Sequence, residues 1–189
     1  MKRLKEQLIE TYNLLNILLH DEETENKVTT ATKLIADTLK ENHPFLICGN
    51  GGSASDSMHI AGELVGRFLK ERKALNVICL SSNPAVITAW ANDYSYEDIF
   101  VRQVEAYAKT GGVLLGISTS GNSKNVVRAF EMARSMNVKT IALTGKGGGK
   151  LSGISDILIE VPSNHTPRIQ EMHIMLYHYI CERVEEILS

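Results

Sequence analysis

Residues 45–68 read FLICGNGGSASDSMHIAGELVGRF, and this stretch decides the fold of the chain. Residues 45–48 are apolar or small without polar alternation, which is typical of a strand covered on both faces of a parallel sheet. Residues 49–53 (GNGGS) allow a sharp turn and leave backbone amides free at the start of a helix, where an anion or a sugar hydroxyl can bind. The pattern predicts a strand, a glycine turn and a helix.

The predicted helix carries two stripes of side chains. Helical spacing places Met58, Ala61, Val65 and Phe68 on an apolar stripe. The neighbouring stripe is polar and holds Asp56, His59, Glu63 and Arg67. Because His59 and Glu63 are four residues apart, we expect their side chains to project side by side.

Composition bounds the class of protein. A length of 189 residues with 43% apolar content predicts one domain over residues 1–189. The net charge of -2 and the scattered basic residues argue against a nucleic-acid partner and against a membrane-binding patch. Cys48, Cys79 and Cys181 lack CxxC spacing, which favours buried thiols in a reducing compartment. Because no secretory signal and no apolar run of membrane-spanning length is evident, we expect a cytoplasmic protein with a small substrate.

Two helices are predicted before the first strand, in residues 1–41. Apolar residues recur at helical spacing from Leu4 to Leu19, and a second helix is expected from about Glu23 to Glu41. The first helix is apolar on more than one side. It therefore packs either against another subunit or across its own domain.

Strands and helices alternate through residues 42–189. Further strands are predicted at 75–80, 112–117, 138–143 and 157–161, with helices at 84–90, 96–108, 124–136 and 167–188. This alternation predicts a three-layer α/β fold with a mostly parallel five-stranded sheet. No Walker or GxGxxG pattern opens a helix after any of these strands, so a nucleotide cofactor is not supported.

A second loop that could bind a ligand is STSGNS, residues 118–123, between a buried strand and a helix. Hydroxyls and amides at a helix N-terminus suit a phosphate dianion, although ordinary capping explains most loops of this composition. Two such loops after two parallel strands favour the phosphate, because ligands of open α/β sheets bind at the carboxyl ends of the strands.

The last predicted helix carries Gln170, Ile174 and His178 along one face. Taken singly, His59 and Glu63 could form a surface ion pair, and Gln170 and His178 could be polar groups at a packing edge. Together the two pairs could form a metal site of nitrogen and oxygen ligands or an acid/base set.

Five segments resemble the sugar isomerase (SIS) domain of phosphoheptose isomerases: CGNGGSASDSMHIAGELVGRF, ANDYSYEDIF, LLGISTSGNSKNV, LTGKGGG and RIQEMH. The resemblance covers essentially the whole chain. It implies an aldose–ketose isomerase that converts sedoheptulose 7-phosphate into D-glycero-D-manno-heptose 7-phosphate through an enediol. This is the first step of heptose precursor synthesis for lipopolysaccharide, capsule or another glycan. The resemblance also implies a homotetramer.

The resemblance assigns roles to individual residues. It implies that Glu63 is the general base, that His178 is its acid/base partner, and that zinc is held by His59, Glu63, Gln170 and His178. Besides Glu63 and Gln170, the implied substrate contacts are Asn50, Gly51, Gly52, Ser53, Asn92 and Asp93, with a phosphate cradle of Ser118, Thr119, Ser120 and Ser123.

One position departs from the family pattern. Some relatives have an acidic residue where this chain has Pro167, and His165 is a conceivable substitute. The alternatives to an enzyme are a non-catalytic SIS protein that binds the replication initiator DnaA and a regulatory domain that senses a phosphosugar. The joint presence of Glu63, Gln170 and His178 favours the enzyme.

Overall fold

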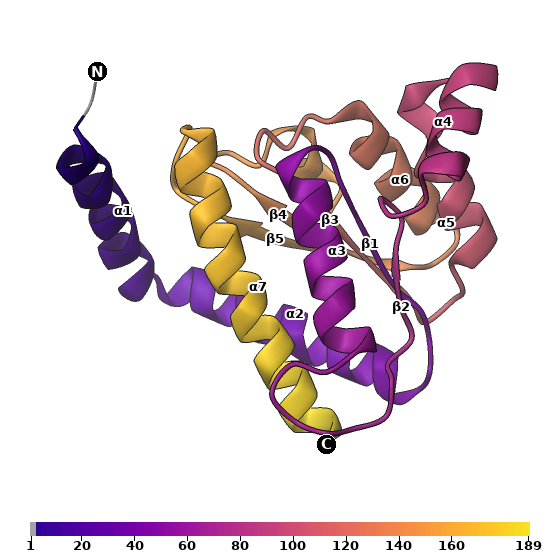
Figure 1. Cartoon of the computed structure of the whole chain (residues 1–189), viewed down its shortest axis with the longest axis horizontal. Helices are drawn as coiled ribbons and strands as arrows, with labels where there is room; N and C mark the ends of the chain where they lie inside the picture. The colour runs from indigo at the N-terminus through magenta and orange to yellow at the C-terminus, as the bar shows by residue number, and fades with distance from the viewer. Residues whose placement is uncertain (1–2) are drawn as a thin grey trace.

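A five-stranded sheet forms the middle layer of the computed structural model, which describes residues 3–189 (Figure 1). Its strands are β1 (Phe45–Gly49), β2 (Val77–Cys79), β3 (Val113–Ser118), β4 (Lys139–Thr144) and β5 (Ile157–Glu160). They lie in the order β2-β1-β3-β4-β5, and every neighbouring pair is parallel. The five predicted strands are confirmed, with end points that differ by one or two residues.

Helices cover both faces of the sheet, as the predicted three layers require. They are α1 (Leu4–Leu19), α2 (Glu22–Lys40), α3 (Gly52–Val65), α4 (Pro84–Asp93), α5 (Val101–Tyr107), α6 (Lys124–Ser135) and α7 (Thr166–Leu188). Two short 3-10 helices, η1 (Tyr96–Asp98) and η2 (Gly149–Gly153), complete the structure. Figure 1 shows α3 and α7 beside each other in front of the sheet, with α5 and α6 on its other side.

The core is built from alternate strand residues. In β1, Phe45 and Ile47 pack against α2, α3 and α7, whereas Leu46 and Cys48 pack against α5 and α6. Both faces exclude water, which explains why the strands are continuously apolar. The three cysteines are free and buried, as predicted.

Helix α3 differs from its prediction in length and in its buried face. It ends at Val65 and not at Phe68, because the backbone leaves the helical region at Gly66, where ψ is -112°. The predicted apolar stripe is wrong as a packing face, since Met58 and Val65 are exposed. The buried residues of α3 are Ser53, Asp56, Ser57, Ile60 and Leu64, which contact the sheet and α7.

The helix predicted over residues 96–108 is also wrong as a continuous element. Ser95 Oγ accepts a hydrogen bond from the Glu97 amide and starts η1, and α5 begins only at Val101. Between them Ile99 and Phe100 are both buried, so the chain bends to direct two adjacent side chains into one core.

The leading helices pack differently from each other. Helix α2 contributes five buried side chains, from Val28 to Leu39, to the core on the face of the sheet that α3 and α7 also cover. Helix α1 lies at the edge of the molecule beside α7 and buries only Leu14 (Figure 1). Of the helices in residues 3–189, none is long and apolar enough to cross a membrane.

Candidate active site

The glycine turn between β1 and α3 is tightly packed. Gly51 has a φ of 56°, in the left-handed region that favours glycine. A Cβ on Gly49 would lie 2.5 Å from the Ser53 carbonyl oxygen, and one on Gly52 would lie 2.6 Å from Gln170 Nε2. The turn therefore needs glycine at positions 49 and 51, and the short contact at Gly52 shows that Gln170 of α7 lies against the start of α3.

Asn50 connects this turn to the first turn of α6. Its side-chain amide pairs with that of Asn125 through two hydrogen bonds of 2.9 Å, and Tyr96 donates a third of 2.9 Å to Asn50 Oδ1. Asn125 is only 2% exposed. Sequence reasoning missed both partners, because Asn125 lies 75 residues from Asn50.

The serine loop, residues 118–123, opens beside the glycine turn because β1 and β3 are neighbours and Gly49 pairs with Ile117. Ser118 Oγ lies 2.9 Å from Ser123 Oγ, and the Gly121 amide donates to the Ser118 carbonyl at 2.9 Å. The Asn122 amide donates to Ser120 Oγ at 3.2 Å. Adjacent parallel strands thus bring together the two loops that the sequence singled out.

A third loop, residues 145–149, supports the serine loop. The Gly145 amide donates to the Thr119 carbonyl at 3.0 Å. A Cβ on Gly149 would lie 2.4 Å from the Ser120 carbonyl oxygen, and one on Gly121 would lie 1.9 Å from that of Gly148. Only glycine permits this contact between the loops.

Three predicted site residues form a cluster between α3 and α7. Metal-binding atoms of His59, Glu63 and His178 all lie within 4.8 Å of one another. His59 Nε2 is 2.9 Å from Glu63 Oε1, and the rings of His59 and His178 meet edge to face with centroids 5.0 Å apart. Two imidazoles and one carboxylate are the donor set of catalytic zinc sites that keep a position open for substrate, so these residues fit zinc.

A chain of hydrogen bonds runs from the Nδ1 side of His59 through Tyr177 to Asp56. His59 Nδ1 is 2.9 Å from the Tyr177 hydroxyl, which donates a long bond of 3.4 Å to Asp56 Oδ1. Burial raises the pKa of Asp56, although the bond from Tyr177 opposes this. Burial and the nearby Asp56 carboxylate both raise the pKa of Tyr177, which keeps it a phenol. The sequence placed Asp56 on the polar stripe but gave no sign of Tyr177.

His178 is held by aromatic rings on two sides. Phe68 stacks on it with centroids 5.8 Å apart and planes inclined by 17°, and Tyr177 meets it edge-on at 4.9 Å. Phe68 comes from the loop that follows α3. The orientation of His178 therefore depends on a segment outside helix α3.

The chain is similar to known proteins in both sequence and fold. Residues 13–145 match the model of the SIS domain. Phosphoheptose isomerase from Helicobacter pylori strain Shi470 is 53% identical over 152 residues, which cover 80% of this chain and 79% of the relative. The chain belongs to the phosphoheptose isomerase family.

Solved structures of this family share the whole fold. Phosphoheptose isomerase from Neisseria gonorrhoeae superposes with a TM-score of 0.88 at 36% identity, covering 97% of each chain. The phosphoheptose isomerase from Francisella tularensis superposes with a TM-score of 0.88 at 33% identity. The match covers 98% of this chain and 100% of that chain. Because the SIS match ends at residue 145, helix α7 with Gln170 and His178 lies outside it. These residues are the part of the site that the SIS match does not cover.

Three further residues implied by the family, Gln170, Asn92 and Asp93, lie outside this cluster. Gln170 is eight residues before His178 on α7, with its amide beside Gly52, so its role as a fourth zinc ligand stays a prediction. Asn92 and Asp93 are exposed in the last turn of α4, which extends past the predicted end, and Asn92 donates to the Asp93 carboxylate at 2.8 Å. Among residues 3–189, no hydrogen bond joins either to the glycine turn or to the cluster.

The position that departs from the family pattern lies at the start of α7. Pro167 occupies the first turn of the helix, where its missing amide costs nothing. His165 caps this helix and directs Nδ1 toward Glu10 of α1, at 3.8 Å. This contact with α1 does not support His165 as a substitute for the acidic residue.

Proposed function

We propose that this protein isomerises sedoheptulose 7-phosphate to D-glycero-D-manno-heptose 7-phosphate. The observation that carries the proposal is the convergence of Glu63, His59 and His178 between α3 and α7. Relatives that are about half identical over most of the chain are phosphoheptose isomerases.

The reaction moves a carbonyl from C2 to C1 without any net oxidant. A base removes a proton from C1, an enediol forms, and a proton returns to C2 while the hydroxyl protons are redistributed between the two oxygens. Glu63 is the carboxylate of the cluster, and we assign to it the removal of the proton from C1 and its return to C2. We assign to His178 the transfer of protons between the two oxygens. The side chain of Glu63 is 19% exposed, so a substrate can reach it.

The serine loop is assigned to the phosphate. Ser118, Ser120 and Ser123 supply hydroxyls, and the N-terminus of α6 supplies unpaired amides and a positive dipole end. The nearby Lys124 is paired with Glu97 at 2.7 Å, so the donors are mainly neutral. Binding of the remote phosphate serves to orient C1 and C2 at Glu63.

We also assign zinc to His59, Glu63 and His178, with Gln170 as the further ligand that the family resemblance implies. When bound there, zinc would polarise a substrate oxygen as a Lewis acid. A homotetramer in the cytoplasm completes the proposal. It is supported by the exposed apolar side chains of α1 and by three buried free thiols.

The test is incubation of the purified protein with sedoheptulose 7-phosphate, followed by NMR of the sugar, with and without zinc. We expect heptose 7-phosphate to form. Glu63→Gln should lower kcat by roughly a hundredfold to ten-thousandfold while the phosphosugar still binds. Glu71→Gln, at an exposed glutamate beyond α3, is the matched control and should behave as wild type. A near-full rate in Glu63→Gln would remove Glu63 from the mechanism.

A further inference from the structure

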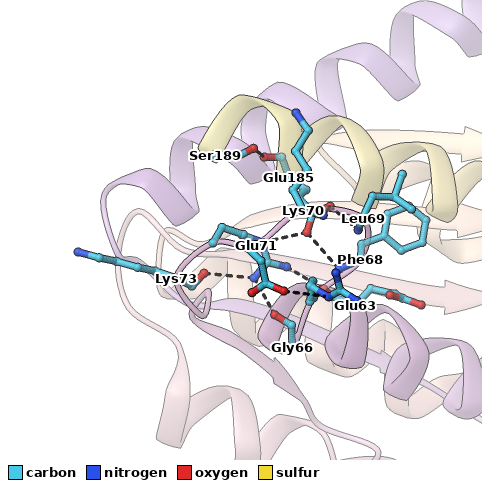
Figure 2. A network of polar contacts seen from close by, with 11 residues as sticks. Glu63, Gly66, Phe68, Leu69, Lys70, Glu71, Lys73, Glu185 and Ser189 are labelled. Atoms are coloured by element: carbon cyan, nitrogen blue, oxygen red, sulfur yellow. Dashed lines mark hydrogen bonds and ion pairs between the residues drawn. The ribbon is translucent and has the colours of Figure 1, made fainter.

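Glu185 is a buried carboxylate that takes no part in the proposed chemistry. It lies near the end of α7 and is 1% exposed. Its oxygens accept hydrogen bonds from three successive backbone amides, those of Phe68 at 3.1 Å, Leu69 at 2.6 Å and Lys70 at 2.9 Å (Figure 2). The end of α7 thus holds the loop that follows α3.

Arg72 completes this network from the loop side. Its side chain is 3% exposed, and its Nε lies 3.3 Å from Glu185 Oε1. Its guanidinium donates to the carbonyls of Glu63 at 2.7 Å, Gly66 at 3.0 Å and Lys73 at 3.1 Å. The Glu63 carbonyl belongs to the last turn of α3, where carbonyls lack helical partners. Arg72 therefore fixes the end of the helix that carries the proposed base.

A buried ion pair is weak evidence for a gain in stability, because desolvation offsets most of the attraction. Burial opposes ionisation of Glu185, but the three amides and Arg72 together hold its pKa below the usual range. The pair is therefore charged at neutral pH. The pair orders this region locally, since three amides and two carbonyls of the irregular segment, and the Glu63 carbonyl at the end of α3, all find partners.

The segment that is ordered in this way carries Phe68, whose ring stacks on His178. We propose that Glu185 and Arg72 are positioning residues. They hold Phe68 against His178, and they fix the last turn of α3, which carries Glu63. Their side chains are only 1% and 3% exposed, which leaves no surface for a substrate to contact. The functional part of this inference rests on the proposed roles of Glu63 and His178.

The first experiment measures the contact itself, in the metal-free protein. The ring current of Phe68 should shift the carbon-bound ring protons of His178, observed by NMR with isotope-labelled histidine. Phe68→Leu removes the aromatic ring, so the change that it causes identifies the ring-current shift. Glu185→Gln should lose most of the shift, whereas Glu182→Gln, at a half-exposed glutamate on the same helix, should keep it. An unchanged shift in Glu185→Gln would overturn the inference.

Glu185→Gln leaves Arg72 buried without its partner and can prevent folding. The double variant Glu185→Gln with Arg72→Met removes both charges and keeps the volume of the side chains similar. We expect it to fold and to lose the ring-current shift. A folded double variant with the wild-type shift would show that the pair is purely structural.

The second experiment separates catalysis from binding. In Glu185→Gln or the double variant, kcat should fall about tenfold. Losses of this size are typical when a residue that orients an active-site side chain, without contacting the substrate, is replaced. KM should change little, because the serine loop lies on a different element. A lower unfolding midpoint with wild-type kcat would overturn the positioning role. If wild type itself forms no heptose 7-phosphate, the proposed function fails, and the ring-current shift still decides this inference.

Discussion

At the scale of single residues, the two ring nitrogens of His59 face different partners. Nε2 faces Glu63, and Nδ1 faces the Tyr177 hydroxyl. When Tyr177 donates to Asp56, its oxygen accepts the proton of Nδ1, and the lone pair of Nε2 is left for a metal. Tyr177 therefore favours the tautomer of His59 that the proposed zinc site requires.

We predict that Tyr177→Phe weakens zinc binding by about tenfold to a hundredfold, because the tautomer of His59 loses its support. The measurement is competition with a chelator of known affinity. Tyr179→Phe is the control, since this tyrosine is on the same helix, is 46% exposed and packs under Arg183. Equal zinc affinity in the two variants would contradict the prediction, provided that their unfolding midpoints show both to be folded.

At the scale of elements, the shape of the serine loop depends on the loop that follows β4. Gly121 and Gly149 have φ values of 63° and 53°, and each approaches the backbone of the other loop. The Lys150 amide adds a hydrogen bond of 3.1 Å to Asn122 Oδ1. The loops that follow the neighbouring strands β1, β3 and β4 thus lie at one edge of the sheet, and the third of these loops shapes the second.

We predict that Gly149→Ala raises KM for sedoheptulose 7-phosphate about tenfold, because the clash with the Ser120 carbonyl and the left-handed backbone together cost roughly 1–3 kcal/mol. The value of kcat should change less, since Glu63 and His178 lie on other elements. Gly153→Ala is the matched control, because a Cβ there meets nothing within 4 Å. The prediction is wrong if both variants have the KM of wild type.

At the scale of the whole molecule, α1 leaves many apolar side chains exposed. Leu8 and Tyr12 are exposed by 59% and 68%, and the helix contacts the rest of the chain mainly through α7. A helix that is apolar on more than one side buries its outer face against another molecule in a stable oligomer. This exposed surface agrees with the proposed homotetramer.

We predict that Leu8→Lys combined with Tyr12→Lys lowers the mass of the assembly in sedimentation equilibrium, because two charges would enter an apolar interface. Gln7→Lys, at an exposed polar position of the same helix, should leave the assembly intact. A wild-type protein that sediments as a monomer at micromolar concentration would refute the homotetramer itself.

Stability of the whole molecule should depend on pH through His173, which is fully buried between α7 and β4. Burial lowers the pKa of His173 to about 4, although the bond to the Thr144 carbonyl opposes this. The unfolded chain, with a histidine pKa near 6.5, then binds more protons than the folded chain between about pH 6.5 and 4. The free energy of unfolding should therefore decrease as the pH is lowered from about 6.5 to 4, by roughly 3 kcal/mol in total.

The check is denaturant unfolding of wild type and His173→Gln at several pH values. Glutamine can still donate to the Thr144 carbonyl but does not titrate, so its stability curve should be flatter between pH 6.5 and 4. His20→Gln, at an exposed position on the end of α1, should follow wild type. Parallel curves for wild type and His173→Gln would contradict the assigned pKa.

Much of this molecule follows from local sequence patterns. Continuous apolar runs predicted the five strands, helical periodicity predicted most helices, and the GNGGS and STSGNS loops marked the ligand edge. Spacings of four and eight residues put His59 beside Glu63 and placed Gln170 and His178 on one face of a helix. These features are predictable because each depends on dihedral angles and side-chain periods within a few residues.

Only the tertiary structure decided which distant residues meet. The strand order β2-β1-β3-β4-β5 brings Asn125 to Asn50, and the packing of α3 against α7 brings Tyr177 to Asp56, 121 residues away. The end of α3 at Val65 depends on Glu185 and Arg72, which satisfy the polar backbone groups of the following loop. No local pattern encodes these contacts, because a buried polar group takes its partner from whichever element the completed core places beside it.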